Sequence, residues 1–136
     1  CARDGRPFSV VILDLDHFKR VNDTWGHPTG DRVLQAAARV LRQSVRSSDH
    51  VGRYGGEEFV IMLPDTTLEQ GVEAMKRLQR ELTRRFFLSD KEKILITFSA
   101  GVAQFAPEES GHEAIQRADR AMYLAKRAGK NRVMAA

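Results

Sequence analysis

The sequence predicts an α+β fold with a mainly antiparallel central sheet flanked by helices, of the ferredoxin-like type. Residues 8–15 form a β-rich apolar run, as expected of a central strand buried on both faces. A Gly-Gly pair separates two further strand-like runs, which indicates a tight β-hairpin. Helical and alternating patterns then follow in turn. The resulting order of strand, helices, hairpin, helix, strand, helix and strand fits a split βαβ arrangement.

The first half of the chain contains one helix that can be placed by its spacing. Residues 31–45 carry apolar side chains at helical intervals, namely Leu34, Ala37, Leu41 and Val45. Gly26, Pro28 and Gly30 precede this pattern, so we expect the chain to break just before it. The two arms of the hairpin are then residues 51–54 and 59–63.

The second half contains two helical patterns and one alternating pattern. A long helix is marked by one face with a single polar member: Leu68, Val72, Met75, Gln79, Leu82 and Phe86. Residues 94–102 alternate as a strand should. Ile115, Ala118, Met122 and Ala125 mark the last helix, and Gly129 is placed to cap it. Residues 131–134 are expected to form a short final strand.

Composition sets broad bounds. A chain of 136 residues with 42% hydrophobic content can bury one core, so we expect a single domain. No apolar run approaches the roughly 20 residues of a membrane span, and no signal peptide is visible. The one cysteine, Cys1, excludes an internal disulfide and fits a reducing cytoplasm. The net charge of +4 allows an anionic ligand such as a nucleotide.

Three carboxylates mark a candidate site. Asp14 ends the first strand, and Glu57 and Glu58 follow the hairpin turn. If the strands are neighbours, these acids converge at one edge of the sheet. Three acids together repel one another without a cation, and Mg²⁺ or Mn²⁺ prefers such oxygen ligands. A two-metal clamp for phosphoryl or nucleotidyl transfer is the chemical interpretation, and acids on a solvated loop are the structural alternative.

Three separated blocks together resemble one known family. They are residues 14–31, the hairpin sequence Gly-Gly-Glu-Glu-Phe at 55–59, and residues 118–131. In this order they resemble the GGDEF domain of diguanylate cyclases over essentially the whole chain, in the Gly-Gly-Glu-Glu-Phe variant of its signature. That domain is similar to the palm of adenylyl cyclases and polymerases, in agreement with the predicted fold.

The resemblance implies a metal site. Asp14 and Glu57 would bind metal through their side chains, Leu15 through its backbone carbonyl, and Glu58 would add a further carboxylate. Two Mg²⁺ or Mn²⁺ ions are implied per active half-site. One of the two glutamates would help to deprotonate the attacking 3′-hydroxyl, and which one is left open. Metal coordination also lowers the pKa of that hydroxyl.

The resemblance implies a second group of residues that contact phosphate. Gly55 and Gly56 would let the backbone approach it, His17 and Phe18 would offer N–H groups, and Lys19, Lys126 and Lys130 would contact the triphosphate. Among these, Lys19 is a candidate for stabilising the transition state. Lys130 stands where the family more often has arginine, which retains the charge but loses the bidentate fork. A lysine at this position also favours the dipole of the preceding helix without any ligand.

Guanine recognition is implied for Asn22 and Asp31. A carboxylate can accept hydrogen bonds from guanine N1–H and the exocyclic amine, whereas adenine would leave it unpaired at a cost of about 1–3 kcal/mol. Asp31 is also consistent with an acid at a helix N-terminus, and Asn22 with a turn residue. His27 lies beside these readers, either as a direct contact or as a polar turn residue. Trp25 is expected to serve packing.

A regulatory site is implied by the Arg-x-x-Asp of Arg46 and Asp49. Its distance before the signature matches the family's inhibitory site, and Arg77 sits where a second arginine of that site is expected. Arginine can pair with guanine O6 and N7, and aspartate can accept N1–H. An intercalated cyclic di-GMP dimer would suit this set. The alternative is a surface ion pair worth under about 1 kcal/mol.

The function expected from these features is condensation of two GTP into cyclic di-GMP with release of two pyrophosphates. The symmetry of the product requires two domains in a C2 arrangement, which we expect to be a transient homodimer imposed by an upstream sensor or receiver domain. A degenerate GTP or cyclic di-GMP sensor is the alternative. A nucleic-acid-binding role is disfavoured, because no basic stripe with interleaved aromatics is present.

The chain also departs from the family pattern at its start. The usual first helix and Leu-Thr-x-Leu-x-Asn-Arg type segment are missing before residue 8. We therefore expect residues 1–136 to be a GGDEF domain without its N-terminal segment, excised from a longer multidomain protein. The expected location is the cytoplasm, or the cytoplasmic portion of a membrane-anchored parent.

Overall fold

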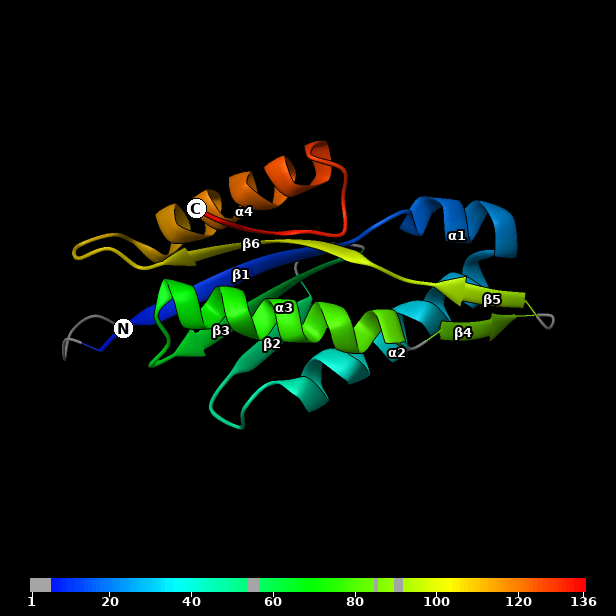
Figure 1. The fold of residues 1–136 in the computed structure, drawn as a ribbon, viewed down its shortest axis with the longest axis horizontal. Helices are drawn as coiled ribbons and strands as arrows, with labels where there is room; N and C mark the ends of the chain where they lie inside the picture. Colours follow the sequence, from blue (N-terminus) through cyan, green and yellow to red (C-terminus); the bar gives the residue numbers. More distant parts are fainter. Residues whose placement is uncertain (1–5, 54–56, 85, 90–91) are drawn as a thin grey trace.

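A five-stranded sheet forms the centre of the computed structural model, which describes residues 6–53, 57–84, 86–89 and 92–136 (Figure 1). Its strands are β1 (Phe8–Leu15), β2 (His50–Arg53), β3 (Glu58–Pro64), β6 (Phe98–Gln104) and β7 (Val133–Ala135). They lie in the order β2-β3-β1-β6-β7, and every neighbouring pair is antiparallel except β6–β7. The predicted α+β class and the mainly antiparallel sheet are therefore confirmed.

The helices cover both faces of this sheet. They are α1 (Phe18–Trp25), α2 (His27–Ser44), α3 (Leu68–Arg84) and α4 (Gly111–Arg127). In Figure 1, α4 lies on one face, and α2 and α3 lie on the other. A separate two-stranded sheet of β4 (Phe86–Ser89) and β5 (Glu92–Leu95) extends from the same end of the molecule as α1.

β1 is the central strand, and its alternation divides the core. Val11 and Leu13 belong to the large cluster formed with α1, α2 and α3. Val10 and Ile12 belong to the smaller cluster under α4. All four side chains are fully buried, and burial of each contributes about 1.5–3 kcal/mol. Because both faces of β1 are buried in this way, its sequence is a continuous apolar run, as predicted.

α4 approaches the sheet closely at Gly101 of β6. A Cβ atom at this position would overlap the carbonyl oxygen of Ala118 and the backbone nitrogen of Met122. The helix lies directly on the strand because this residue has no side chain. This contact sets the height of α4, which carries Lys126, above the sheet.

Several of the predicted boundaries were wrong. The helix predicted from residue 31 begins at His27. Pro28 stands in its first turn, where backbone N–H groups have no partner within the helix, so the missing N–H of the proline costs no hydrogen bond. The predicted strand 94–102 is divided into β5 and β6. Residues 92–95 lie beyond the reach of β1, which ends at Leu15, and they pair with β4 instead. Phe86 therefore lies in β4 and not on the face of α3.

The last strand, predicted at residues 131–134, is shifted to Val133–Ala135. The remaining expectations for the elements agree with the structure. The two arms of the hairpin are β2 and β3, paired in register from His50↔Met62 to Arg53↔Phe59. Gly55 and Gly56, which were assigned to the turn, lie outside the described residues. Among the described residues, no helix is long and apolar enough to cross a membrane.

Candidate active site

Two of the predicted carboxylates meet where β1 and β3 pair. Asp14 lies opposite Glu58 in the antiparallel register. The N–H of Leu15 donates to the carbonyl oxygen of Glu57 at 3.2 Å. The structure thus brings the end of the first strand beside the start of the strand after the hairpin, as the sequence predicted.

The ionised carboxylate of Asp14 is destabilised by its surroundings. Its carboxyl has a pKa raised to about 6, chiefly by burial and also by the neighbouring Glu57 and Glu58, against the opposing effect of Lys126. Its Oδ1 atom is buried and has no hydrogen-bond partner among the residues that the structure describes. A buried carboxylate oxygen without a donor is rare in folded proteins. A cation bound here would satisfy that oxygen and offset the repulsion.

Glu58 shows the same tendency to a smaller degree. Burial, followed by repulsion from Asp119 of α4 and from Glu57, raises its pKa. Among the described residues, no group of three His, Cys, Asp or Glu side chains is arranged to hold a metal ion. The acids therefore lie near one another but are not an assembled ligand cage. Mg²⁺ usually takes one or two carboxylates and completes its shell with water and substrate phosphates, so this donor set fits such an ion.

Lys126 supplies the positive charge at this site. Its Nζ lies 3.2 Å from Asp14 Oδ2 and 3.6 Å from Asp16 Oδ1. The side chain is 23% exposed, so part of it reaches solvent. The lysine predicted to contact a triphosphate is therefore placed between the acidic strand end and the surface.

Lys130 is held by the C-terminal cap of α4. The N–H of Lys130 donates to the carbonyl of Ala125 at 3.0 Å, and that of Gly129 to the carbonyl of Lys126 at 3.3 Å. This pair of bonds is a Schellman motif. Gly129 takes a φ of +126°, in agreement with its predicted capping role. Lys130 itself has a φ of +65°, which is uncommon for a residue with a Cβ atom.

The start of α1 presents backbone donors next to the acids. His17 is the N-cap of this helix, in the left-handed conformation, and Phe18 is its first residue. The first N–H groups of a helix have no partner within it. Lys19 follows with an exposed side chain. The residues predicted to contact phosphate through N–H groups therefore occupy a helix N-terminus.

The predicted guanine readers lie close together at the junction of α1 and α2. A Cβ atom at Gly30 would overlap Oδ1 of Asn22, so the carboxamide of Asn22 packs directly on the first turns of α2. Asp31 is the next residue and is exposed. It is the fifth residue of a helix that begins at His27, beyond the first turn where the dipole acts most strongly. His27 is exposed at the first position of α2. Trp25 packs against the large core cluster, as expected.

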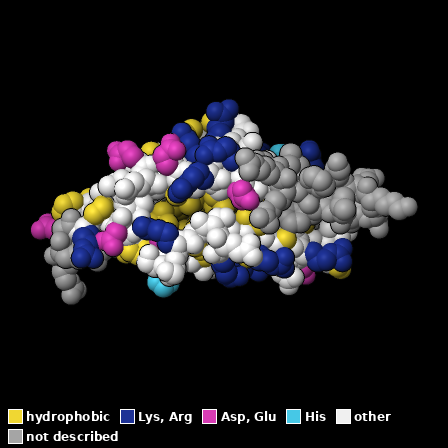
Figure 2. Space-filling view, turned by 60° about the horizontal axis from the view of Figure 1, so that its bottom comes forward, with side chains coloured by type: hydrophobic (Ala, Val, Ile, Leu, Met, Phe, Trp, Pro, Cys, Tyr) yellow, Lys and Arg dark blue, Asp and Glu magenta, His cyan; other side chains and the backbone are white. Residues whose placement is uncertain are grey.

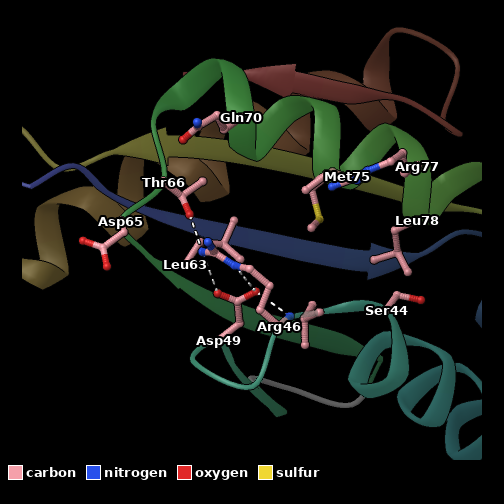
Figure 3. A pocket seen from close by; sticks show the side chains of 12 residues that line it. Ser44, Arg46, Asp49, Leu63, Asp65, Thr66, Gln70, Met75, Arg77 and Leu78 are labelled. Atoms are coloured by element: carbon pink, nitrogen blue, oxygen red, sulfur yellow. Dashed lines mark hydrogen bonds and ion pairs between the residues drawn. The ribbon is translucent and has the colours of Figure 1, made fainter.

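A separate pocket of about 260 Å³ contains all three residues predicted for the inhibitory site. Arg46 and Asp49 lie on one of its sides, and Arg77 of α3 lies on the opposite side (Figure 3). The apolar side chains of Leu63, Met75 and Leu78 line it as well. Figure 2 shows Lys and Arg side chains around an apolar hollow near the centre of the face that it draws.

Arg46 is already fixed in this pocket. Its Nη2 lies 3.1 Å from Asp49 Oδ1, and it donates to the carbonyl of Pro64 at 2.7 Å and to Thr66 Oγ1 at 2.8 Å. The backbone N–H of Arg46 also donates to Asp49 Oδ2 at 2.9 Å. The Asp49 side chain is only 4% exposed, whereas that of Arg46 is 56% exposed. Asp49 and its neighbours thus hold the guanidinium group of Arg46 in one position, while the Arg46 side chain remains accessible to solvent.

The sequence analysis did not assign site roles to Asp16, Gln79 and Asp119. Asp16 was visible as the second acid of an Asp-x-Asp at the end of a buried strand. Gln79 was visible as the one polar residue on an apolar helix face. No sequence signal placed Asp119 near Glu58, because that proximity depends on how α4 crosses the sheet.

Comparisons with known proteins agree on one family. A family model described as "Diguanylate cyclase, GGDEF domain" matches residues 1–132. Diguanylate cyclase DgcP of Pseudomonas aeruginosa is 45% identical over 131 residues, which are 96% of this chain and 20% of that protein. Diguanylate cyclase DosC of Escherichia coli is 41% identical over 132 residues, 96% of this chain and 29% of that protein. The chain therefore spans less than a third of either relative.

The fold is similar to that of a solved domain with a bound nucleotide. The GGDEF domain of DgcB from Caulobacter crescentus, in complex with c-di-GMP, superposes with a TM-score of 0.94 at 38% identity. The match covers 98% of this chain and 81% of that chain.

Proposed function

Because the chain belongs to the diguanylate cyclase GGDEF domain family, we propose that it condenses two GTP molecules into cyclic di-GMP and two pyrophosphates. In each of two steps, a 3′-hydroxyl oxygen attacks the α-phosphorus of the opposite GTP. A new P–O bond forms, the bond to the β-phosphate oxygen breaks, and the hydroxyl proton is lost to a base or to water.

The observation that carries this proposal is the buried, unpaired Oδ1 of Asp14 beside Glu58. A carboxylate kept in such a place needs a cation or a proton. Asp14, Glu57, Glu58 and the carbonyl of Leu15 would hold two Mg²⁺ or Mn²⁺ ions in each half-site. When bound, such ions neutralise the charge on the phosphates and lower the pKa of the attacking hydroxyl.

The side chains of the protein then have distinct tasks. The N–H groups of His17 and Phe18 would bind phosphate oxygens at the N-terminus of α1. Lys126 and Lys130 would bind the triphosphate, and Lys19 would stabilise the charge that develops in the transition state.

Base selection would fall to Asn22 and Asp31, with His27 beside them. The carboxamide of Asn22 lies against Gly30, the residue before Asp31, which supports a shared role of Asn22 and Asp31 at one purine edge. The carboxylate would accept from N1–H and the amine of guanine, which adenine cannot supply together. Glu57 or Glu58 would assist removal of the proton from the 3′-hydroxyl.

One domain cannot close the ring of the product, so the proposal requires two domains in a C2 arrangement. We propose a transient homodimer, brought together by a sensor or receiver domain elsewhere in a longer polypeptide. The chain matches only 20% and 29% of the lengths of DgcP and DosC, which is consistent with further domains in a longer polypeptide.

The pocket with Arg46, Asp49 and Arg77 is proposed as a product-inhibition site. Its volume of about 260 Å³ is below the range in which whole drug-sized ligands are enclosed, so it would anchor part of a ligand. Arg46 is already ordered by Asp49 and Thr66, which lowers the entropic cost of binding a guanine edge or a phosphate. Cyclic di-GMP carries both groups.

The test is incubation of the protein at high concentration with GTP and Mg²⁺, followed by chromatography for cyclic di-GMP. We expect product from the wild type and none from a Glu57→Ala, Glu58→Ala variant. Glu73→Ala, which changes an exposed acid on α3, is the matched control and should retain activity. Binding of GTP without any product in the wild type would favour the alternative, a nucleotide sensor.

A further inference from the structure

The segment that follows α4 is held from two sides by side chains with no assigned function. From β1, Asp16 Oδ2 accepts the backbone N–H of Asn131 at 2.8 Å. From α3, Gln79 Nε2 donates to the carbonyl oxygen of Asn131 at 2.6 Å and to its Oδ1 at 2.8 Å. Asn131 directly follows Lys130, and both have positive φ. These bonds fix a backbone conformation that is otherwise unfavourable.

Asp16 is itself fully fixed. Its side chain is 0% exposed. Thr97 Oγ1 donates to Oδ2 at 2.8 Å, and Ser99 Oγ donates to Oδ1 at 2.6 Å. The same Oδ1 lies 3.6 Å from Lys126 Nζ. One buried carboxylate therefore connects β1, the β5–β6 connection, β6, Lys126 and the segment after α4.

We propose that Asp16 and Gln79 are positioning residues that hold Lys126 and Lys130 for the β- and γ-phosphates of GTP. This inference rests on the proposed function. Lysine side chains are long and lose considerable rotamer freedom when they bind, so a fixed backbone and a fixed neighbouring charge reduce the cost of ordering them. Neither Asp16 nor Gln79 is assigned to touch substrate.

The change Asp16→Asn breaks this arrangement in either orientation of the amide. If the NH₂ group replaces Oδ2, it faces the N–H of Asn131, and two donors meet. If it replaces Oδ1, it faces the ammonium group of Lys126, and again two donors meet. The hydroxyls of Thr97 and Ser99 can turn to accept, whereas an N–H and an ammonium cannot. The isosteric variant therefore attacks the positioning contacts more than the packing.

The experiment measures binding by calorimetry in the presence of Mg²⁺, with two probes. The α,β-methylene analogue of GTP carries three phosphorus groups and cannot release pyrophosphate, and GMP carries one phosphate. For Asp16→Asn and for Gln79→Ala we expect the Kd of the analogue to rise about tenfold and that of GMP to change less than about twofold. Gln116→Ala, which changes an exposed glutamine on α4, should leave both constants unchanged.

Equal weakening of both probes by these variants would show a purely structural role and overturn the inference. An unchanged Kd for the analogue in both variants would also overturn it. If Asp16→Asn does not fold, Gln79→Ala decides alone, because Gln79 is only half-buried on the helix surface. A wild type that binds neither probe would instead contradict the proposed function.

Discussion

Asp14→Asn is expected to stabilise the metal-free protein, although it should abolish catalysis. Burial and two neighbouring glutamates raise the pKa of Asp14 from 3.8 to about 6 in the folded state. That shift already includes the favourable effect of Lys126. The ionised carboxylate is therefore less favourable in the folded protein than in the unfolded chain, and an asparagine of the same shape avoids that cost.

The magnitude follows from the pKa shift. A shift of one pKa unit corresponds to about 1.4 kcal/mol, so the ionised form destabilises the fold by about 3 kcal/mol at pH 7. Below about pH 4 the carboxyl is protonated in both states, and this penalty vanishes. It grows as the pH rises toward 6 and is constant above that. The advantage of Asp14→Asn should therefore be near zero at pH 4 and about 3 kcal/mol at pH 7.

The assay is urea denaturation in the presence of a chelator, at several pH values between 4 and 7.5. Asp23→Asn, which changes an exposed acid on α1, is the control and should alter the unfolding free energy by less than about 0.5 kcal/mol. An Asp14→Asn variant that is less stable than the wild type at pH 7 would refute the reasoning. An advantage that does not depend on pH would refute it as well.

Three further outcomes are expected from other parts of the structure. Gly101→Ala should lower the unfolding free energy by about 1–3 kcal/mol or more in urea denaturation, because the new methyl group meets the backbone of α4 at Ala118. Glu109→Gln should cost about 1.5–3 kcal/mol at pH 7, since the bidentate pair with Arg117 is lost. That pair, together with the backbone N–H of Ala106, lowers the pKa of Glu109 to about 2, so the difference from wild type should disappear as the pH falls from about 4.5 to 2 in acid titrations. Arg46→Ala should weaken cyclic di-GMP binding at least about tenfold by calorimetry while leaving turnover at low product concentration unchanged.

The fold could be predicted where one periodicity dominated a segment. β1 is buried from Ser9 to Leu15 because helices cover both of its faces, and this required an unbroken apolar run such as Val10–Leu13. The errors came where tertiary pairing decided the outcome. Alternation through Ile96 and Phe98 could not reveal that β1 ends at Leu15 and that residues 92–95 pair with β4. Likewise, Pro28 predicted a break before a helix, whereas it stands in the first turn.

The site could be predicted in part because its chemistry is local in the sequence. Paired acids after a glycine hairpin indicate metal binding by their type and spacing alone. The contacts that support the site are not local. The hydrogen bond from Asn131 to Asp16 spans 115 residues, and that from Gln79 to Asn131 spans 52. Neither hydrogen bond could be predicted from composition or periodicity, and the one relevant sequence feature was the polar residue Gln79 on an apolar helix face.

Asp14 and Asp16 show why residue type alone does not separate an acid satisfied by the protein from one open to a ligand. The two residues leave the same strand end, and both are largely buried. Asp16 accepts from two hydroxyls and one backbone N–H, so its charge is satisfied by the protein itself. Asp14 has one buried oxygen with no donor and two glutamates nearby. A fold that satisfies one carboxylate fully and leaves its neighbour unsatisfied keeps the second available for a ligand, and the stability lost at Asp14 is the physical consequence of that arrangement.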